Sequence, residues 1–230
     1  MERIDFHDAE IVETGDGSST LKHSVLGELY HSRHGAWTES HHIFIKHGLS
    51  EFLGGEIKPI QVFEMGFGSG LNAALTREAA DKYRHPVHYT SIELYPIRES
   101  VIRDMDMPGQ TDVERERWLE LHSTPWDEEV KITPYFTIHK IRGTFPNSSL
   151  KIPGKFDLIY YDAFAPAAQP ELWSFDTLAE CFDLLNSGGR WLSFCAKGQV
   201  RRDLQEVGFE VEALPGPPGK REITRAVKVK

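Results

Sequence analysis

The chain has 230 residues, of which 40% are hydrophobic and 11% aromatic, enough apolar material for one globular domain with a sizeable core. Its formal net charge of −9 argues against a broad nucleic-acid-binding surface, because phosphate groups require cations. No apolar run approaches the roughly 18 residues of a membrane-spanning helix, and the acidic N-terminus lacks the features of a signal peptide. Cys181 and Cys195 are expected to be buried free thiols, which indicates a cytoplasmic protein.

The chain begins with a segment that differs from the rest. Residues 1–35 are expected to form a small β extension, because short strand-like runs flank the turn residues Gly15-Asp16-Gly17-Ser18. Residues 36–230 are expected to form the main domain, packed against this extension. Its first helix is predicted between Glu39 and Leu53, where apolar residues recur at helical spacing.

Three glycines alternate in the sequence FEMGFGSG, residues 63–70. An apolar, β-prone run precedes them from Ile60, and a strongly helical run follows from Leu71. Nucleotide-like ligands bind at such strand–loop–helix junctions in open α/β sheets, because glycines let the ligand lie against bare main chain. The alternative is a tight turn without a ligand.

The glycine spacing is G-x-G-x-G, which differs from the G-x-G-x-x-G fingerprint of dinucleotide-binding proteins. With Glu64 two residues before the first glycine, it resembles the first motif of S-adenosylmethionine-dependent methyltransferases. A carboxylate at this place favours an ammonium group, or water organised around one, and repels a pyrophosphate.

A second acidic residue strengthens this interpretation. The run Val87–Glu93 is predicted to be a strand that ends in a carboxylate, about 20 residues beyond the glycine loop. Glu93 is therefore expected to accept hydrogen bonds from both hydroxyls of a ribose. A solvated glutamate at a strand end is the alternative.

The remaining segments alternate between strands and helices. A polar stretch from Asp104 to Glu129, with Trp118 and Trp126, is expected to be a helical insertion that covers the sheet edge. We predict further strands at Lys131–Gly143, Phe156–Asp162, Arg190–Ala196, Phe209–Leu214 and Ile223–Val229, helices at Phe175–Leu185 and Gln199–Val207, and a helix stop at 186–189. This order predicts an α/β, Rossmann-like fold with a mostly parallel sheet and helices on both faces.

Asp162 is the candidate catalytic residue, because it ends a strand whose carboxyl end should face the same crevice as the glycine loop. If a methyl group is transferred to an amine, a carboxylate orients the amine, accepts its hydrogen bond and stabilises the cationic product. Phe164 and Pro166 would supply an apolar wall that excludes water and stacks on a planar base. The alternative for Asp162 is a cap of the following loop.

Charge is distributed unevenly. From Arg190 to Lys230 nine Lys and Arg stand against five Asp and Glu, so this segment has a net charge of +4 and the remainder −13. On charge alone, ordinary solvated surface is an adequate explanation of this segment.

Several longer pieces carry a more specific resemblance: FEMGFGSGLN, SIELYPI, FDLIYYDAFAPAAQPELW, LNSGGRW and VRRDLQEVGFEVEALPGPPGKRE. From about Glu28 to about Glu222 the chain resembles the methyltransferase half of the bifunctional tRNA 5-methylaminomethyl-2-thiouridine biosynthesis proteins. The resemblance implies an enzyme that uses S-adenosylmethionine to methylate the amine of 5-aminomethyl(-2-thio)uridine at the tRNA wobble position. It also implies a stand-alone form without the flavin domain, and a separate oxidase or another upstream tRNA-modifying enzyme that supplies the aminomethyl group.

The resemblance also assigns residues. For the cofactor it implies Glu64, Gly66, Phe67, Gly68, Gly70, Asn72, Glu93 and Thr144. For the substrate it implies Asp162 as the catalytic residue, with Tyr30, Glu39, Phe164, Pro166, Lys197, Arg201, Arg202, Lys220 and Arg221, the five basic residues being candidates for tRNA phosphates. One departure concerns Thr144, which stands where relatives often carry an acid that bonds the adenine amino group; its hydroxyl or backbone is expected to serve instead.

Three other interpretations of the sequence can be weighed at this point. The histidines His31, His34, His41, His42 and His47 crowd one region, but neither a structural zinc pattern nor HExxH is present, so no metal is expected. An aminopropyltransferase of the spermidine-synthase type would share the fold, the strand-end acid and an amine acceptor. A non-catalytic module that binds RNA or protein on a methyltransferase-like fold is the third alternative.

Overall fold

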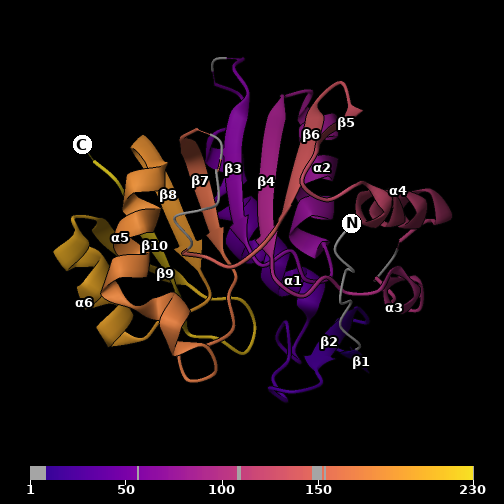
Figure 1. Ribbon diagram of the computed structural model, residues 1–230, viewed down its shortest axis with the longest axis horizontal. Coiled ribbons are helices and arrows are strands. Elements are labelled where there is room, and N and C mark those ends of the chain that lie inside the picture. The colour runs from indigo at the N-terminus through magenta and orange to yellow at the C-terminus, as the bar shows by residue number, and fades with distance from the viewer. Residues whose placement is uncertain (1–8, 56, 108–109, 147–151, 153, 230) are drawn as a thin grey trace.

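A computed structural model describes residues 9–55, 57–107, 110–146, 152 and 154–229. These residues form an eight-stranded sheet in the order β5-β6-β4-β3-β7-β8-β10-β9 (Figure 1). Strands β6, β4, β3, β7 and β8 run parallel, whereas β5, β10 and β9 pair antiparallel with their neighbours. The strands are β3 (Ile60–Met65), β4 (Val87–Glu93), β5 (Glu129–Thr133), β6 (Phe136–Arg142), β7 (Phe156–Tyr161), β8 (Leu185–Ser193), β9 (Glu210–Pro215) and β10 (Glu222–Val227). The predicted mostly parallel α/β sheet is confirmed.

Helices cover both faces of the sheet because strand side chains alternate between them. Val62 and Tyr160 pack on one face with α2 and the segment around α1, while Phe63 and Tyr161 pack on the other with α5 and α6. Figure 1 shows α5 and α6 together on one side of the sheet. The helices are α1 (Ala36–Ser40), α2 (Leu71–Tyr83), α3 (Glu99–Arg103), α4 (Asp112–Ser123), α5 (Phe175–Leu184) and α6 (Gly198–Val207).

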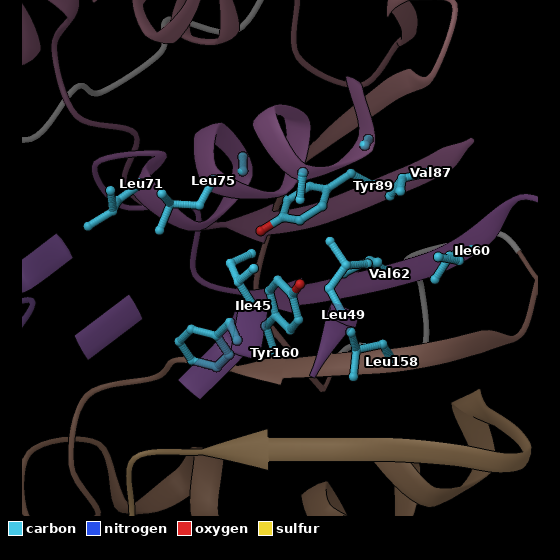
Figure 2. Packing of buried hydrophobic residues seen from close by; sticks show 14 of the residues in the cluster. Ile45, Leu49, Ile60, Val62, Leu71, Leu75, Val87, Tyr89, Leu158 and Tyr160 are labelled. Carbon is cyan, nitrogen blue, oxygen red and sulfur yellow. The ribbon is translucent and has the colours of Figure 1, made fainter. Parts of the chain in front are cut away.

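The core beneath α2 fixes the start of this helix. Figure 2 shows Leu71 and Leu75 on the side of α2 that faces Tyr89 and Tyr160, whose ring centroids are 6.0 Å apart. All four side chains are buried. Since burying one large apolar side chain contributes about 1.5–3 kcal/mol, this packing holds the first turn of α2 firmly on the sheet. The glycine loop that precedes α2 therefore has a rigid support.

The N-terminal β element is also present. Strands β1 (Ala9–Glu13) and β2 (Ser19–His23) form an antiparallel pair beside the main sheet (Figure 1). The Asp16 carboxylate in their turn accepts hydrogen bonds from Ser18 and from the backbone and hydroxyl of Thr38. Although burial opposes it, these bonds hold the pKa of Asp16 well below its usual value. The turn is thereby tied to α1. The first eight residues of the predicted extension lie outside the described residues.

Three sequence-based boundaries were wrong. The segment Lys131–Gly143 contains two antiparallel strands, β5 and β6, because the chain turns at 134–135. The predicted helix Glu39–Leu53 begins earlier, at Ala36, and continues as a π-helical stretch His41–Lys46 before Gly48 interrupts it. The strand predicted at Arg190–Ala196 is β8, which runs from Leu185 to Ser193, so residues 186–189, predicted as a helix stop, belong to this strand. Within the predicted insertion 104–129 the structure contains α4.

Both cysteines are buried free thiols, as predicted. Burial raises the pKa of each thiol, so neither is a ready thiolate. Among the described residues, no helix combines the length and apolar character needed to cross a membrane.

Candidate active site

A cavity of about 710 Å³ lies at the carboxyl ends of β3, β4 and β7, where the strand order reverses. Small-molecule sites are typically about 300–1,000 Å³ and lie at such switch points. Its walls come from the glycine loop, the loop after β7, the segment after β2 and the β9–β10 turn. The cavity brings together eleven of the predicted site residues: Tyr30, Glu39, Gly66, Phe67, Gly68, Asn72, Glu93, Thr144, Asp162, Phe164 and Lys220.

Glu93 ties the second strand to the glycine loop. Its Oε2 accepts a hydrogen bond from the Gly68 amide at 3.1 Å, and its Oε1 accepts one from the Tyr95 amide at 2.8 Å. Each oxygen keeps further lone pairs, so the carboxylate is held in place and still able to accept other donors. Glu93 therefore lies at the cavity, in the position that the sequence indicated.

Two of the glycines are required by protein neighbours. All three have positive φ angles, and a Cβ at Gly68 would lie 3.0 Å from the Tyr30 ring. A Cβ at Gly70 would lie 2.8 Å from His122 Nε2. At Gly66, by contrast, the nearest atom would be the Asp162 carbonyl at 3.6 Å, which is ordinary contact. The loop is therefore packed between Tyr30 on one side and α4 on the other.

Helix α4 supports the loop from outside the cavity. Trp118 Nε1 and His122 Nε2 both donate to the Ser69 carbonyl, at 2.8 and 2.7 Å. Burial lowers the pKa of His122 to about 4, so its ring is neutral and donates through Nε2. Lys140 of β6 in turn donates to the Leu121 and His122 carbonyls at the end of α4. These contacts fix the loop relative to the sheet.

Sequence reasoning missed His122 and Lys140, and it named Trp118 only as part of an insertion. Lys140 is 1% exposed, and burial lowers its pKa to about 8. A signal was available, because Lys140 falls on the inward phase of β6, in step with the buried Phe136 and Ile138. A lysine at a core position indicates a structural or functional partner.

Glu64 lies behind the cavity wall. It is 1% exposed, its Oε2 accepts from the Ser91 hydroxyl at 2.7 Å, and its Oε1 accepts from Asn72 Nδ2 at 3.0 Å. Burial, opposed by these hydrogen bonds and reinforced by the charge of Asp162, raises the pKa of Glu64 to about 8. Glu64 is therefore protonated at neutral pH and separated from the cavity by Asn72.

Asp162 follows β7 directly and borders the cavity, as predicted. Asn72 Nδ2 donates to its Oδ2 at 2.8 Å. Burial raises the pKa of Asp162, while His31, the Asn72 hydrogen bond and Lys220 lower it and the charge of Glu39 raises it. A carboxyl with a raised pKa is a stronger base than a solvated aspartate, which is the property that proton acceptance requires.

Aromatic rings form the wall opposite the sheet. Tyr30 and Phe164 meet edge to face with ring centroids 4.9 Å apart, and His23 meets Phe164 at 5.4 Å. Burial, together with the charge of Glu93, raises the pKa of Tyr30, so its phenol is neutral. Pro166, predicted to share this wall, lies on the same loop but does not line the cavity. The wall therefore joins the N-terminal element to the loop after β7.

Lys220 lies inside the cavity rather than on an open surface. Its Nζ forms an ion pair with Glu39 Oε1 at 2.7 Å and lies 4.1 Å from the centroid of the Phe194 ring. The other Glu39 oxygen accepts from the Ser32 amide at 2.7 Å. Glu39, although buried, is thus paired on both sides. This link fastens the β9–β10 turn to α1 and, through the Ser32 amide, to the segment before α1.

The other four basic residues predicted to bind phosphates lie outside the cavity. They differ in how far their side chains are exposed and bonded to other residues. Arg201 is engaged by Glu222 at 2.8 Å, by the Thr224 hydroxyl and by a backbone carbonyl, which ties α6 to β10. Lys197 and Arg202 are exposed near the start of α6, and the Arg221 side chain is 94% exposed. Three of the five residues therefore present charge to solvent.

Thr144 follows β6 and borders the cavity beside Gly143, whose amide donates to the Glu93 carbonyl. Its part in adenine recognition stays a prediction. The histidines of the N-terminal region have other partners: His41 stacks on Trp37, and His42 contacts the Pro215 carbonyl and meets the His47 ring with centroids 4.7 Å apart. Within the described part of the chain, no group of three or more His, Cys, Asp and Glu side chains is arranged to hold a metal ion.

Comparisons with known proteins agree with this geometry. A family model described as S-adenosyl-L-methionine-dependent methyltransferase matches residues 117–229. The tRNA 5-methylaminomethyl-2-thiouridine biosynthesis bifunctional protein MnmC of Aromatoleum aromaticum is 30% identical, covering 94% of this chain and 35% of the relative. MnmC of Cupriavidus metallidurans is 30% identical, covering 95% of this chain and 34% of the relative. The chain spans about one third of the length of these curated relatives.

A solved structure extends the comparison to three dimensions. The crystal structure of MnmC2 from Aquifex aeolicus superposes with a TM-score of 0.78 at 28% identity, covering 97% of this chain and 71% of that one. The resemblance inferred from the sequence motifs is therefore confirmed, and S-adenosylmethionine is the cofactor that it implies. By sequence and by fold, the chain is therefore similar to S-adenosylmethionine-dependent methyltransferases, and among them to the MnmC proteins.

Proposed function

We propose that this enzyme methylates the amine of 5-aminomethyl(-2-thio)uridine at the wobble position of tRNA. The names of its relatives point to this modification. The observation that carries the proposal is the position of Asp162: a carboxyl with a raised pKa, held by Asn72, inside a cavity walled by Tyr30 and Phe164. An amine is methylated in its neutral form and its product sheds a proton, and a carboxyl of this kind can accept that proton.

The residues present fit the cofactor. Gly66 leaves bare main chain at the cavity, with no protein atom closer than 3.6 Å to the place of a Cβ. Glu93 presents a fixed carboxylate that suits ribose hydroxyls, and Phe67, Gly68 and Thr144 complete the same rim. When bound there, S-adenosylmethionine supplies a methyl group on a sulfonium. Gly70 does not line the cavity, and the absence of a side chain there leaves room for the His122 ring.

The chain's own residues then have distinct tasks. Asp162 accepts a hydrogen bond from the acceptor amine and takes up the proton that the amine releases. Phe164 and Tyr30 exclude water and offer ring edges and faces to the uracil base. Glu39 and Lys220 hold the wall that faces Asp162, and their ion pair keeps each charge compensated.

We further propose that the tRNA backbone docks on the exposed cations outside the cavity. Lys197, Arg202 and Arg221 are exposed to phosphates, although Arg202 donates to Gln199 and Arg221 lies 3.9 Å from a carboxylate oxygen of Glu222. Arg201 and Lys220 of the predicted set are less exposed and form shorter ion pairs. The net charge of −13 over residues 1–189 repels RNA elsewhere, which would confine docking to this face. A cytoplasmic location, and a separate oxidase or another upstream enzyme that delivers the aminomethyl substrate, belong to the same proposal.

Nucleoside mass spectrometry of tRNA from cells with and without the protein tests the function. We expect 5-aminomethyl(-2-thio)uridine to accumulate, and its methylated form to disappear, when the protein is absent. Unchanged tRNA nucleosides, combined with aminopropyl transfer to a polyamine by the purified protein, would favour the spermidine-synthase-type alternative. The homology does not favour that alternative or a non-catalytic binding module.

A further inference from the structure

Glu64, Asn72 and Asp162 form one connected unit across three elements. Glu64 is on β3, Asn72 is in the first turn of α2, and Asp162 follows β7, the strand paired with β3. One nitrogen, Asn72 Nδ2, donates to both carboxyls, at 3.0 Å to Glu64 Oε1 and 2.8 Å to Asp162 Oδ2. Because an amide nitrogen has two hydrogens, both are used and the amide orientation is fixed from two sides.

We propose that Glu64 is a positioning residue for methyl transfer, which acts through Asn72 on the orientation of Asp162, and is not a direct ligand of the cofactor. This inference rests on the proposed function of Asp162. Glu64 is 1% exposed, and its two oxygens are already bonded to Ser91 and Asn72. Asn72 lines the cavity, whereas Glu64, to which it is bonded, does not.

The unit also explains why an acid can be buried beneath the glycine loop. Two carboxylates linked by one neutral amide would repel each other if both were charged. The raised pKa of Glu64 favours its protonated form, so the two carboxyls can share a single negative charge instead of carrying two. With Oδ2 bonded to Asn72, the lone pairs of Oδ1 are directed to a defined place for the acceptor amine.

The acidity of Asp162 depends on groups from every surrounding element. Glu64 and Asn72 act on it from β3 and α2, His31 and Glu39 act from the N-terminal segment and α1, and Lys220 acts from the β9–β10 turn. The Asn72 bond lowers the pKa of Asp162. If Asn72 is released from its anchor on Glu64 and turns away, the pKa of Asp162 should therefore rise. The acid limb of the kcat profile should then move to higher pH.

The test compares Glu64→Ala with Glu64→Gln, using S-adenosylmethionine titration and kcat measured across pH with tRNA that carries 5-aminomethyluridine. Gln retains an oxygen for Asn72, and its amide nitrogen takes the place of Oε2, so the Ser91 hydroxyl must turn from donor to acceptor, as it would towards a protonated acid. For Glu64→Ala we expect kcat to fall about tenfold, as for a misplaced catalytic group, with its acid limb moved to higher pH and the S-adenosylmethionine Kd within about twofold of wild type. Glu64→Gln should restore kcat at pH 7 and return the acid limb to its wild-type position.

A control variant at Glu93, which is expected to bind the cofactor, distinguishes cofactor binding from the positioning role proposed for Glu64. Glu93→Gln should weaken S-adenosylmethionine binding, whereas the Glu64 variants should not. Equal weakening in Glu64→Ala, Glu64→Gln and Glu93→Gln would overturn the inference, because it would place Glu64 on the cofactor. A lower kcat in Glu64→Ala with an unmoved acid limb would also overturn it. If wild-type protein transfers no methyl group to this tRNA, the proposed function fails, a result that the same assay shows separately.

Discussion

Replacing Glu64 by Gln should alter how the stability of the protein depends on pH. The folded protein keeps Glu64 protonated up to a pKa of about 8, while in the unfolded chain its pKa returns to the ordinary value of 4.5. Unfolding between these values therefore releases a proton, so rising pH favours the unfolded state. Each pKa unit corresponds to about 1.4 kcal/mol, so the cost carried by wild type grows by up to about 4 kcal/mol from pH 5 to pH 8.

The neutral glutamine of the Glu64→Gln variant carries no such cost. The variant should match wild type near pH 5 and become more stable than wild type by about 2–4 kcal/mol at pH 8, the lower figure allowing for adjustment of Asp162. His122 has a depressed pKa, so its contribution to stability disappears as pH falls from 6.5 towards 4. This contribution is common to both proteins and cancels in their difference.

Urea unfolding followed by circular dichroism at pH 5, 6, 7 and 8 measures the effect. The free energy of unfolding of the variant minus that of wild type should increase steadily over this range. A difference that is constant from pH 5 to pH 8 would refute the reasoning, because it would mean that Glu64 ionises alike in the folded and unfolded states.

Three further predictions concern binding and turnover. Glu93→Ala should weaken S-adenosylmethionine binding by about 1.5–3 kcal/mol, the scale of a hydrogen bond to a charged group. Titration calorimetry on the folded variant measures this, and wild-type affinity would exclude the assignment of Glu93 to the ribose. Asp162→Ala should reduce kcat by roughly a hundredfold without loss of folding. Wild-type rates in both Asp162→Ala and Asp162→Asn would mean that Asp162 only caps the following loop. Replacing Lys197, Arg202 and Arg221 by Ala should make the logarithm of the tRNA binding constant fall less steeply with the logarithm of the salt concentration, by about 0.7–0.9 for each phosphate that is no longer neutralised. Cofactor affinity should be unchanged. An unaltered slope would mean that these three side chains are ordinary solvated cations.

The sequence predicted the central part of the fold because its signals are local. Alternating glycines between an apolar run and a helical run located the β3–α2 junction, and the acids at the ends of β4 and β7 followed from the carboxyl-end rule. The hairpin of β5 and β6 was missed because the run alternates only weakly and its turn lacks a glycine or Asn-Gly pair; Pro134 in that turn was the available signal of a break.

The arrangement around the cavity could be predicted only in part. Local patterns singled out Glu64 and Lys220, but they could not show that Asn72 bonds to Glu64 at the cavity wall or that Lys220 pairs with Glu39. These contacts join residues far apart in sequence, and they depend on packing that no periodicity encodes. His122 was missed for the same reason, since its partner is a backbone carbonyl of the glycine loop.

The most direct test of the proposed function is methyl transfer by the purified protein to a synthetic anticodon stem-loop. One substrate should carry 5-aminomethyluridine at the wobble position, and a matched one 5-methyluridine, which lacks the amine. With isotopically labelled S-adenosylmethionine, we predict that label enters only the first substrate, on the amine nitrogen, and that Asp162→Ala reduces the rate. Label in both substrates or in neither would contradict the account.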